Sequence, residues 1–87
     1  MTQFAKVEET TRPTGDNVAE MMCERGMNYA LGRDCEKNLV AAHTWFNIAA
    51  VKGSARADKL RAKLTPILNK QELALALRAA REWMTVH

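Results

Sequence analysis

Cys23, Cys35 and His43 are the residues of this chain whose types are suited to zinc binding, and a cysteine can also act as a nucleophile. A structural zinc site needs four ligands, with short spacings inside each ligand pair. The two cysteines are twelve positions apart and no fourth ligand accompanies them. We therefore predict no metal site, and two free thiols rather than a disulfide. His43 is expected at the boundary of the apolar face of its helix, as a rim residue.

Nucleophilic catalysis requires a serine, cysteine or threonine beside a base and an oxyanion site. Ser54 is better explained as a helix cap, because it directly precedes a predicted helix. The segment Gly32-Arg33-Asp34 is too short for a phosphate-binding or dinucleotide-binding loop. The sequence therefore predicts a protein that is not an enzyme and that holds no cofactor.

Basic side chains recur at the helical spacing i, i+4, i+7 and i+11 and form one stripe, namely Lys52, Arg56, Lys59 and Lys63. Residues 37–87 hold nine lysines and arginines against three acidic residues, whereas residues 1–36 hold four against seven. Such a stripe can contact phosphates or an acidic protein. Aromatic residues do not interleave these charges, and no recognition-helix motif stands out. The pattern therefore favours an acidic protein partner over nucleic acid.

The elements that must position these side chains are predicted to be helices. The chain has 87 residues, which allows one domain, and its hydrophobic fraction of 47% suffices for a core. Methionine and alanine are frequent and β-branched residues are few, which favours helices over strands. No apolar run is long enough to cross a bilayer, and the N-terminal residues do not resemble a secretory signal. We predict a cytoplasmic, all-α domain over residues 16–87.

Two helices are expected to form a hairpin over residues 16–53. Residues 1–15 show no periodicity and are predicted to be a flexible tail. The first helix is expected to start at Asp16 or Asn17, and Gly32 is expected to end it in a left-handed conformation. The second helix is expected to follow the N-cap Asn38 and to end at Gly53.

Two further helices are predicted over residues 54–86, which brings the total to four. Ser54 is expected to cap the third helix. Pro66 lacks an amide donor and therefore either ends that helix or kinks it. Asn69 and Glu72 match a capping box at the start of the fourth helix. The stripe of the fourth helix that is expected to be buried consists of Leu73, Leu77, Ala80 and Met84.

The second helix is apolar on two opposite faces. One face carries Leu39, Ala42, Trp45, Phe46 and Ala49. The other face carries Val40, Thr44, Ile48 and Val51, at i, i+4, i+8 and i+11. A helix that is apolar on both sides needs a neighbour on each. We therefore predict that the second stripe contacts a partner protein, together with the basic residues Lys52, Arg56, Lys59 and Lys63.

Small and aromatic residues recur along the hairpin, namely Gly26, Tyr29, Gly32, Ala42, Trp45, Ala49, Ala50 and Gly53. In this pattern residues 22–57 resemble a Sel-one-like repeat, a relative of the tetratricopeptide repeat. The chain departs from the family pattern at Arg25, Asp34, Cys35, Asn38 and Ala41. Asp34 stands where the family has a turn glycine, and aspartate tolerates a left-handed backbone better than most residues.

The resemblance implies a single helical-hairpin repeat with a C-terminal helical extension, of the kind found in small bacterial proteins. It implies protein–protein scaffolding and brings no catalytic residue. Repeats of this type usually need about three copies to bury their faces. Here the C-terminal helices or a second subunit would have to supply the missing neighbour. The sequence thus favours an interaction adaptor, with a nucleic-acid-binding regulator and a self-associating homodimer as alternatives.

Overall fold

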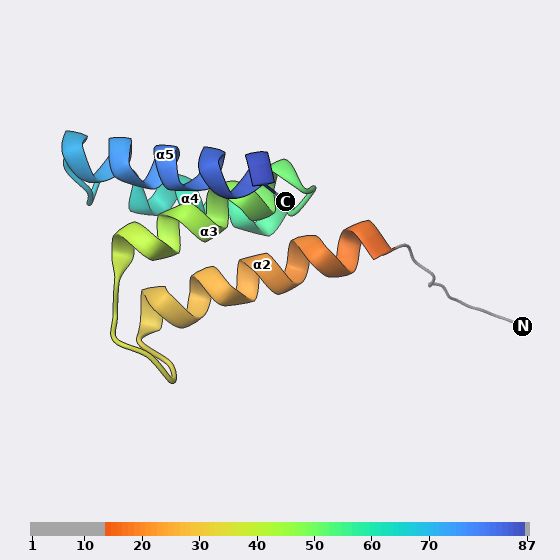
Figure 1. The fold of residues 1–87 in the computed structure, drawn as a ribbon. Coiled ribbons are helices and arrows are strands. Elements are labelled where there is room, and N and C mark those ends of the chain that lie inside the picture. Colours follow the sequence, from red (N-terminus) through yellow and green to blue (C-terminus); the bar gives the residue numbers. More distant parts are fainter. Residues whose placement is uncertain (1–13, 87) are drawn as a thin grey trace, which may run out of the picture.

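The computed structural model describes residues 14–86, with side chains from Val18 onward. Its four helices are α2 (Thr14–Leu31), α3 (Leu39–Val51), α4 (Ala55–Leu64) and α5 (Lys70–Val86), as Figure 1 shows. The described part of the chain contains no strand. The predicted all-α class with four helices is therefore confirmed. Residues 1–13, most of the predicted tail, lie outside the described residues.

Helix α2 begins at Thr14, which corrects the expected start at Asp16 or Asn17. The amides of a first helical turn have no partner inside the helix, so local sequence sets this boundary only weakly. Gly32 ends α2 with a φ of 71°. The amide of Arg33 then donates to the carbonyl of Asn28 at 2.9 Å, which satisfies one of the last carbonyls of the helix.

The turn between α2 and α3 has the predicted left-handed residue, because Asp34 has a φ of 59°. Asn38 caps α3 as expected, and its side-chain oxygen accepts the amide of Ala41 at 3.0 Å. The amide of Asn38 donates in turn to the carbonyl of Tyr29 at 2.9 Å, which joins the turn to α2. Gly53, with a φ of 116°, follows the C-cap of α3.

The caps of α4 and α5 also agree with the prediction. The Ser54 hydroxyl accepts the amide of Ala57 at 3.1 Å. Helix α4 ends at Leu64, so Pro66 ends this helix rather than kinking it. The amide of Asn69 donates to Glu72 Oε1 at 2.9 Å, and the amide of Glu72 donates to Asn69 Oδ1 at 2.8 Å. Both bonds of a capping box are therefore present.

Helix α3 is the centre of the fold and packs against each of the other three helices. Figure 1 shows α2 on one side of α3 and α5 on the other. The buried cluster at this centre consists of Cys23, Ala42, Phe46, Ala49 and Ala57. Because these residues come from α2, α3 and α4, this core is shared between the hairpin and α4.

Gly26 lets α2 approach α3 closely. A Cβ atom at this position would lie 2.5 Å from Phe46 Cε1 and 2.6 Å from Phe46 Cδ1. It would also lie 3.2 Å from the carbonyl oxygen of Ala42. The Phe46 ring is buried and cannot yield without disturbing its neighbours. Glycine is therefore required here by the contact between helices, although it weakens α2 locally.

We expect Gly26→Ala to lower the free energy of unfolding by about 1–3 kcal/mol, the usual cost of overpacking. The clash should outweigh the gain of about 1 kcal/mol in helix propensity. Urea denaturation followed by circular dichroism measures the effect. In a Phe46→Leu background the same substitution should cost less, because the ring that it meets is gone. An unchanged or higher stability of Gly26→Ala would contradict the role given to this contact.

Candidate functional site

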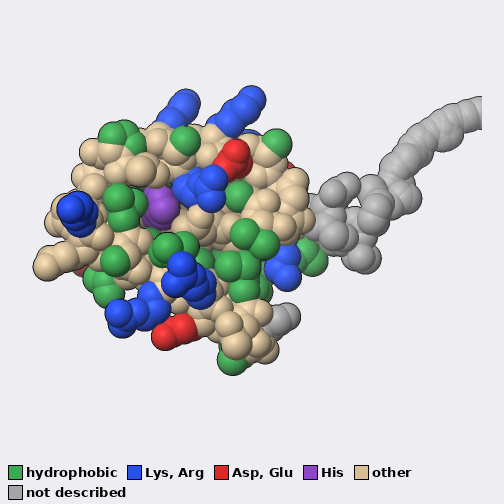
Figure 2. Space-filling view, turned by 90° about the horizontal axis from the view of Figure 1, so that it is seen from above, with side chains coloured by type: hydrophobic (Ala, Val, Ile, Leu, Met, Phe, Trp, Pro, Cys, Tyr) green, Lys and Arg blue, Asp and Glu red, His purple; other side chains and the backbone are tan. Residues whose placement is uncertain are grey.

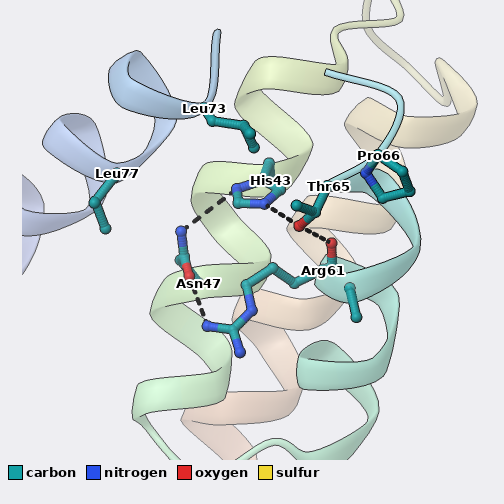
Figure 3. Close-up of a pocket in the computed structure, with 8 residues that line it drawn as sticks. His43, Asn47, Arg61, Thr65, Pro66, Leu73 and Leu77 are labelled. Atoms are coloured by element: carbon teal, nitrogen blue, oxygen red, sulfur yellow. Dashed lines mark hydrogen bonds between the residues drawn. The ribbon is translucent and has the colours of Figure 1, made fainter. Parts of the chain in front are cut away.

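An open groove of about 580 Å³ runs along α3 between α4 and α5. We call it the α4/α5 groove. It is lined by His43 and Asn47 from α3, by Arg61, Ala62, Thr65 and Pro66 from α4 and the turn after it, and by Leu73 and Leu77 from α5. Figure 3 shows the leucines on one wall, with the polar side chains grouped between α3 and α4. The groove therefore combines apolar walls with a polar floor.

The polar floor is a closed ring of hydrogen bonds, which we call the His43 clasp (His43, Asn47, Arg61 and Thr65; Figure 3). Arg61 donates from Nη1 to Asn47 Oδ1 at 2.9 Å. The Asn47 Nδ2 and His43 Nδ1 atoms are 3.4 Å apart, and His43 Nε2 is 3.2 Å from Thr65 Oγ1. The Thr65 hydroxyl donates to the carbonyl of Arg61 at 3.0 Å, which closes the ring.

The direction of these bonds follows from the donors present. The single proton of the Thr65 hydroxyl is used on the carbonyl of Arg61, so Thr65 Oγ1 accepts a hydrogen bond from the N–H at His43 Nε2. Asn47 Oδ1 faces Arg61, so the amide nitrogen of Asn47 faces His43 Nδ1 and donates to it. The network therefore assigns His43 as a neutral imidazole that carries its proton on Nε2.

His43 lies deeper than the sequence predicted. Only 5% of its surface is exposed, so it is a floor residue and not a rim residue. The turn after α4 brings Thr65 over the ring, which a helical projection of α3 alone does not show. Burial lowers the pKa of His43, and the positive charge of Arg61 lowers it further. The sequence feature that could have indicated this site is the i, i+4 pair of polar residues His43 and Asn47 in a mostly apolar helix.

The stripe predicted to contact a partner is largely covered by α5. Ile48 is fully buried, Thr44 is buried and Val40 is half-buried. The Thr44 hydroxyl lies 3.3 Å from the carbonyl of Ala76 in α5. The prediction that Thr44 and Ile48 contact a partner is therefore wrong, because α5 is the second neighbour of α3. Val51 differs from them, because it is 66% exposed.

A second, smaller groove of about 330 Å³ lies along α3 and α5, and Val40, Thr44 and Ile48 line part of it. Trp45 and Trp83 stand in this groove with their ring centroids 5.5 Å apart in an edge-to-face arrangement. The guanidinium of Arg25 lies 4.8 Å above the Trp45 ring. These aromatic side chains thus join α2, α3 and α5, which is a structural role.

The predicted basic stripe divides into two groups. Arg56 pairs with Glu24 at 2.7 Å and with Glu20 at 3.4 Å, so it joins α4 to α2. The hydrogen bond from Arg56 lowers the pKa of Glu24, and Arg33 adds to this effect. Lys52, Lys59 and Lys63 are exposed and form no ion pair within the described residues. Of the four residues of the stripe, only these three lysines are therefore available to a partner.

The repeat-pattern residues have structural positions. Ala42 and Ala49 are fully buried, and Tyr29 and Ala50 pack against the core cluster as half-buried residues. Gly32 and Gly53 have positive φ angles. Cys23 is buried, Cys35 is exposed, and both thiols are free. Residues 14–86 contain no group of three histidine, cysteine or acidic side chains that could hold a metal ion.

No protein-family model matches the chain, and comparison with curated proteins and with solved structures finds no match. The resemblance to a Sel-one-like repeat therefore stays a prediction that rests on the residues named above. Over the described part of the chain, no helix is both long enough and apolar enough to cross a bilayer. The function must accordingly be argued from the groove itself.

Proposed function

We propose that this protein is a non-enzymatic interaction adaptor that binds a segment of a partner protein in the α4/α5 groove. The observation that carries the proposal is an open groove with apolar walls between α4 and α5. Its volume of about 580 Å³ lies within the range of about 300–1,000 Å³ that is typical of ligand sites. Leu77 was predicted to be buried but is 43% exposed in this wall, because the groove leaves it open, and a partner side chain would cover it.

The polar floor favours binding over catalysis. A general base must be free to take a proton from a substrate. In this groove both ring nitrogens of His43 are already engaged, one with Thr65 and one with Asn47. Arg61 is likewise held by Asn47 and Asp58. These side chains therefore give the floor a defined shape rather than a reactive group.

The charge around the groove favours an acidic partner. Helices α4 and α5 carry exposed cations, namely Lys59, Lys63, Lys70, Arg78 and Arg81. Two of the three acidic residues on these helices are already engaged, Asp58 with Arg61 and Glu72 in the capping box. Figure 2 shows blue side chains standing around green patches on this face, with a purple histidine surface between them. The expected partner segment thus combines leucine-like side chains with aspartate or glutamate.

Leu77→Glu tests the proposal, with Leu75→Glu as its matched control. Both leucines lie on α5 and both are exposed, at 43% and 55%, but only Leu77 lines the groove. The probe is a phage-displayed library of random peptides selected on the wild-type protein. We expect selected peptides rich in leucine and acidic residues. Their affinity should fall roughly tenfold or more for Leu77→Glu and stay unchanged for Leu75→Glu.

Equal binding by the two variants would contradict the groove as the site. Two other outcomes point to the alternative functions. A gel shift with DNA or RNA at low salt that weakens steeply as salt is added would indicate phosphate contacts by the lysines. A dimer mass in light scattering that reverts to a monomer in Leu77→Glu would indicate that the groove binds a second copy of the chain.

A further inference from the structure

We propose that the His43 clasp is a proton-sensitive contact that holds α4 against α3 and so sets the shape of the α4/α5 groove. Protonation of His43 opens the clasp, loosens α4 and weakens whatever the groove binds. The loosening of α4 is inferred from the hydrogen bonds of the clasp and does not depend on the proposed function. The effect on binding rests on the proposed function.

The clasp joins segments that are far apart in the sequence. The bond between His43 and Thr65 spans 22 residues, and the bond between Asn47 and Arg61 spans 14. It secures the C-terminal half of α4, a helix of 10 residues whose side chains are mostly exposed. The other anchors of α4 are the apolar contacts of Ala57, Leu60 and Leu64 with the core cluster and the ion pairs of Arg56 with α2. Loss of the clasp therefore removes the polar attachment of α4 to α3.

A charged His43 does not fit the ring. Its Nδ1 would carry a proton and would face the amide nitrogen of Asn47, so that two donors would meet. Rotation of the Asn47 amide by a half turn would repair that contact. It would also turn the amide nitrogen toward Arg61 Nη1, where two donors would meet again. Neither orientation of Asn47 satisfies both neighbours once His43 is charged.

The charged groups around His43 also disfavour its protonation. From α4, Arg61 faces the ring, and its positive charge repels a second one. The Asp58 carboxylate that accompanies Arg61 is engaged by that guanidinium. From α5 the groove residues are Leu73 and Leu77, and the nearby Glu72 accepts the amide of Asn69 in the capping box. Among the described residues, no carboxylate pairs with His43.

The direction of the pH effect follows from the lowered pKa of His43. Above the ordinary histidine pKa of about 6.5, His43 is neutral whether the clasp is open or closed, and the clasp then stabilises the attachment of α4 fully. As the pH falls below this value, the open state takes up a proton before the closed state does. The clasp is therefore lost progressively between the ordinary pKa and the lower pKa of the folded protein.

Hydrogen exchange of the α4 amides tests the clasp on the full-length protein, without a partner. Protection factors, corrected for the intrinsic pH dependence of exchange, are compared at about pH 7.5 and about pH 5. We expect protection of residues 59–64 to fall roughly threefold to tenfold at the lower pH, while α2 and α3 keep theirs. In His43→Gln, which keeps a donor and an acceptor but cannot titrate, α4 protection should not change between the two pH values.

Asn47→Asp is the complementary variant, because a carboxylate accepts from both Arg61 and a charged His43. In this variant α4 should stay protected at about pH 5. The ¹⁵N shifts of the His43 ring should show a proton on Nε2 in the wild type near neutral pH. The proposal is overturned if α4 protection in the wild type does not depend on pH. It is also overturned if His43→Gln or Asn47→Asp loses protection at acid pH as the wild type does.

The binding consequence is measured separately, with a peptide from the library selection. The affinity at about pH 5 is compared with that at about pH 7.5 within each protein, and it should fall for the wild type but not for Asn47→Asp, whose added carboxylate can lower the affinity equally at both pH values. If α4 loses protection at acid pH but no peptide binds at any pH, the proton-sensitive clasp is supported and the proposed function is contradicted. If α4 loses protection at acid pH but the peptide affinity does not change, His43 does not control binding in the groove.

Discussion

Ile48→Glu is expected to destabilise the protein severely, although the sequence pattern alone would suggest a surface substitution. Ile48 is fully buried between α3 and α5, so the carboxylate would enter an apolar region without a partner. An uncompensated buried charge costs roughly 3–5 kcal/mol. A single domain is stable by about 5–15 kcal/mol, so this loss removes much or all of its stability. Far-UV circular dichroism and a urea titration measure it.

Val51→Glu is the matched control, because Val51 belongs to the same predicted stripe one turn further along α3. It is 66% exposed, and a surface substitution of this kind changes the free energy of unfolding by about 0.5 kcal/mol or less. The contrast between the two variants tests whether α5 covers the stripe. If both variants were equally stable, α5 would not lie on α3 as described.

Phe46→Ala is expected to have a comparable effect from the opposite face of α3. The Phe46 ring is 1% exposed and fills the space beside Gly26 that the missing Cβ leaves open. The fully buried residues beside it in the core cluster are Cys23 and three alanines, which are too small to fill the resulting cavity, and the larger side chains packed against the cluster are only partly buried. We therefore expect the free energy of unfolding to fall by about 3–5 kcal/mol.

Chemical denaturation of Phe46→Ala and of the control Leu75→Ala measures this difference. Leu75 is exposed, so its truncation should change stability by about 0.5 kcal/mol or less. A cost below about 1 kcal/mol for Phe46→Ala would show that the hairpin does not depend on this ring. It would also remove the explanation given for Gly26, because the expected cost of Gly26→Ala arises from the same contact.

These variants separate stability from the proposed adaptor function. The residues that hold the hairpin together, such as Gly26 and Phe46, lie away from the α4/α5 groove. Leu77 lies in its wall and is largely accessible, so it can be changed with less risk to the core. A loss of binding in Leu77→Glu together with an unchanged unfolding curve would therefore report on the groove alone.

The sequence by itself determined the helices and their ends. Asn38, Ser54 and the Asn69–Glu72 pair each bond to an amide only three residues away. Gly32, Asp34 and Gly53 adopt left-handed conformations that few other residues tolerate. These interactions are complete within a few positions of the chain, so the residue types alone predict them. The exception is the start of α2, where no internal hydrogen bond marks the boundary.

Only the tertiary structure decided which apolar face is covered and where the groove lies. A helical projection of α3 shows two apolar faces but does not say which helix covers each, so Ile48 and Val51 looked equivalent. The position of α5 separates them, at 0% and 66% exposed. The His43 clasp needs α4 to bring Arg61 and Thr65 over α3, across separations of 14 and 22 residues. Contacts of that range depend on how the helices cross, and that is set by the packing of all four together.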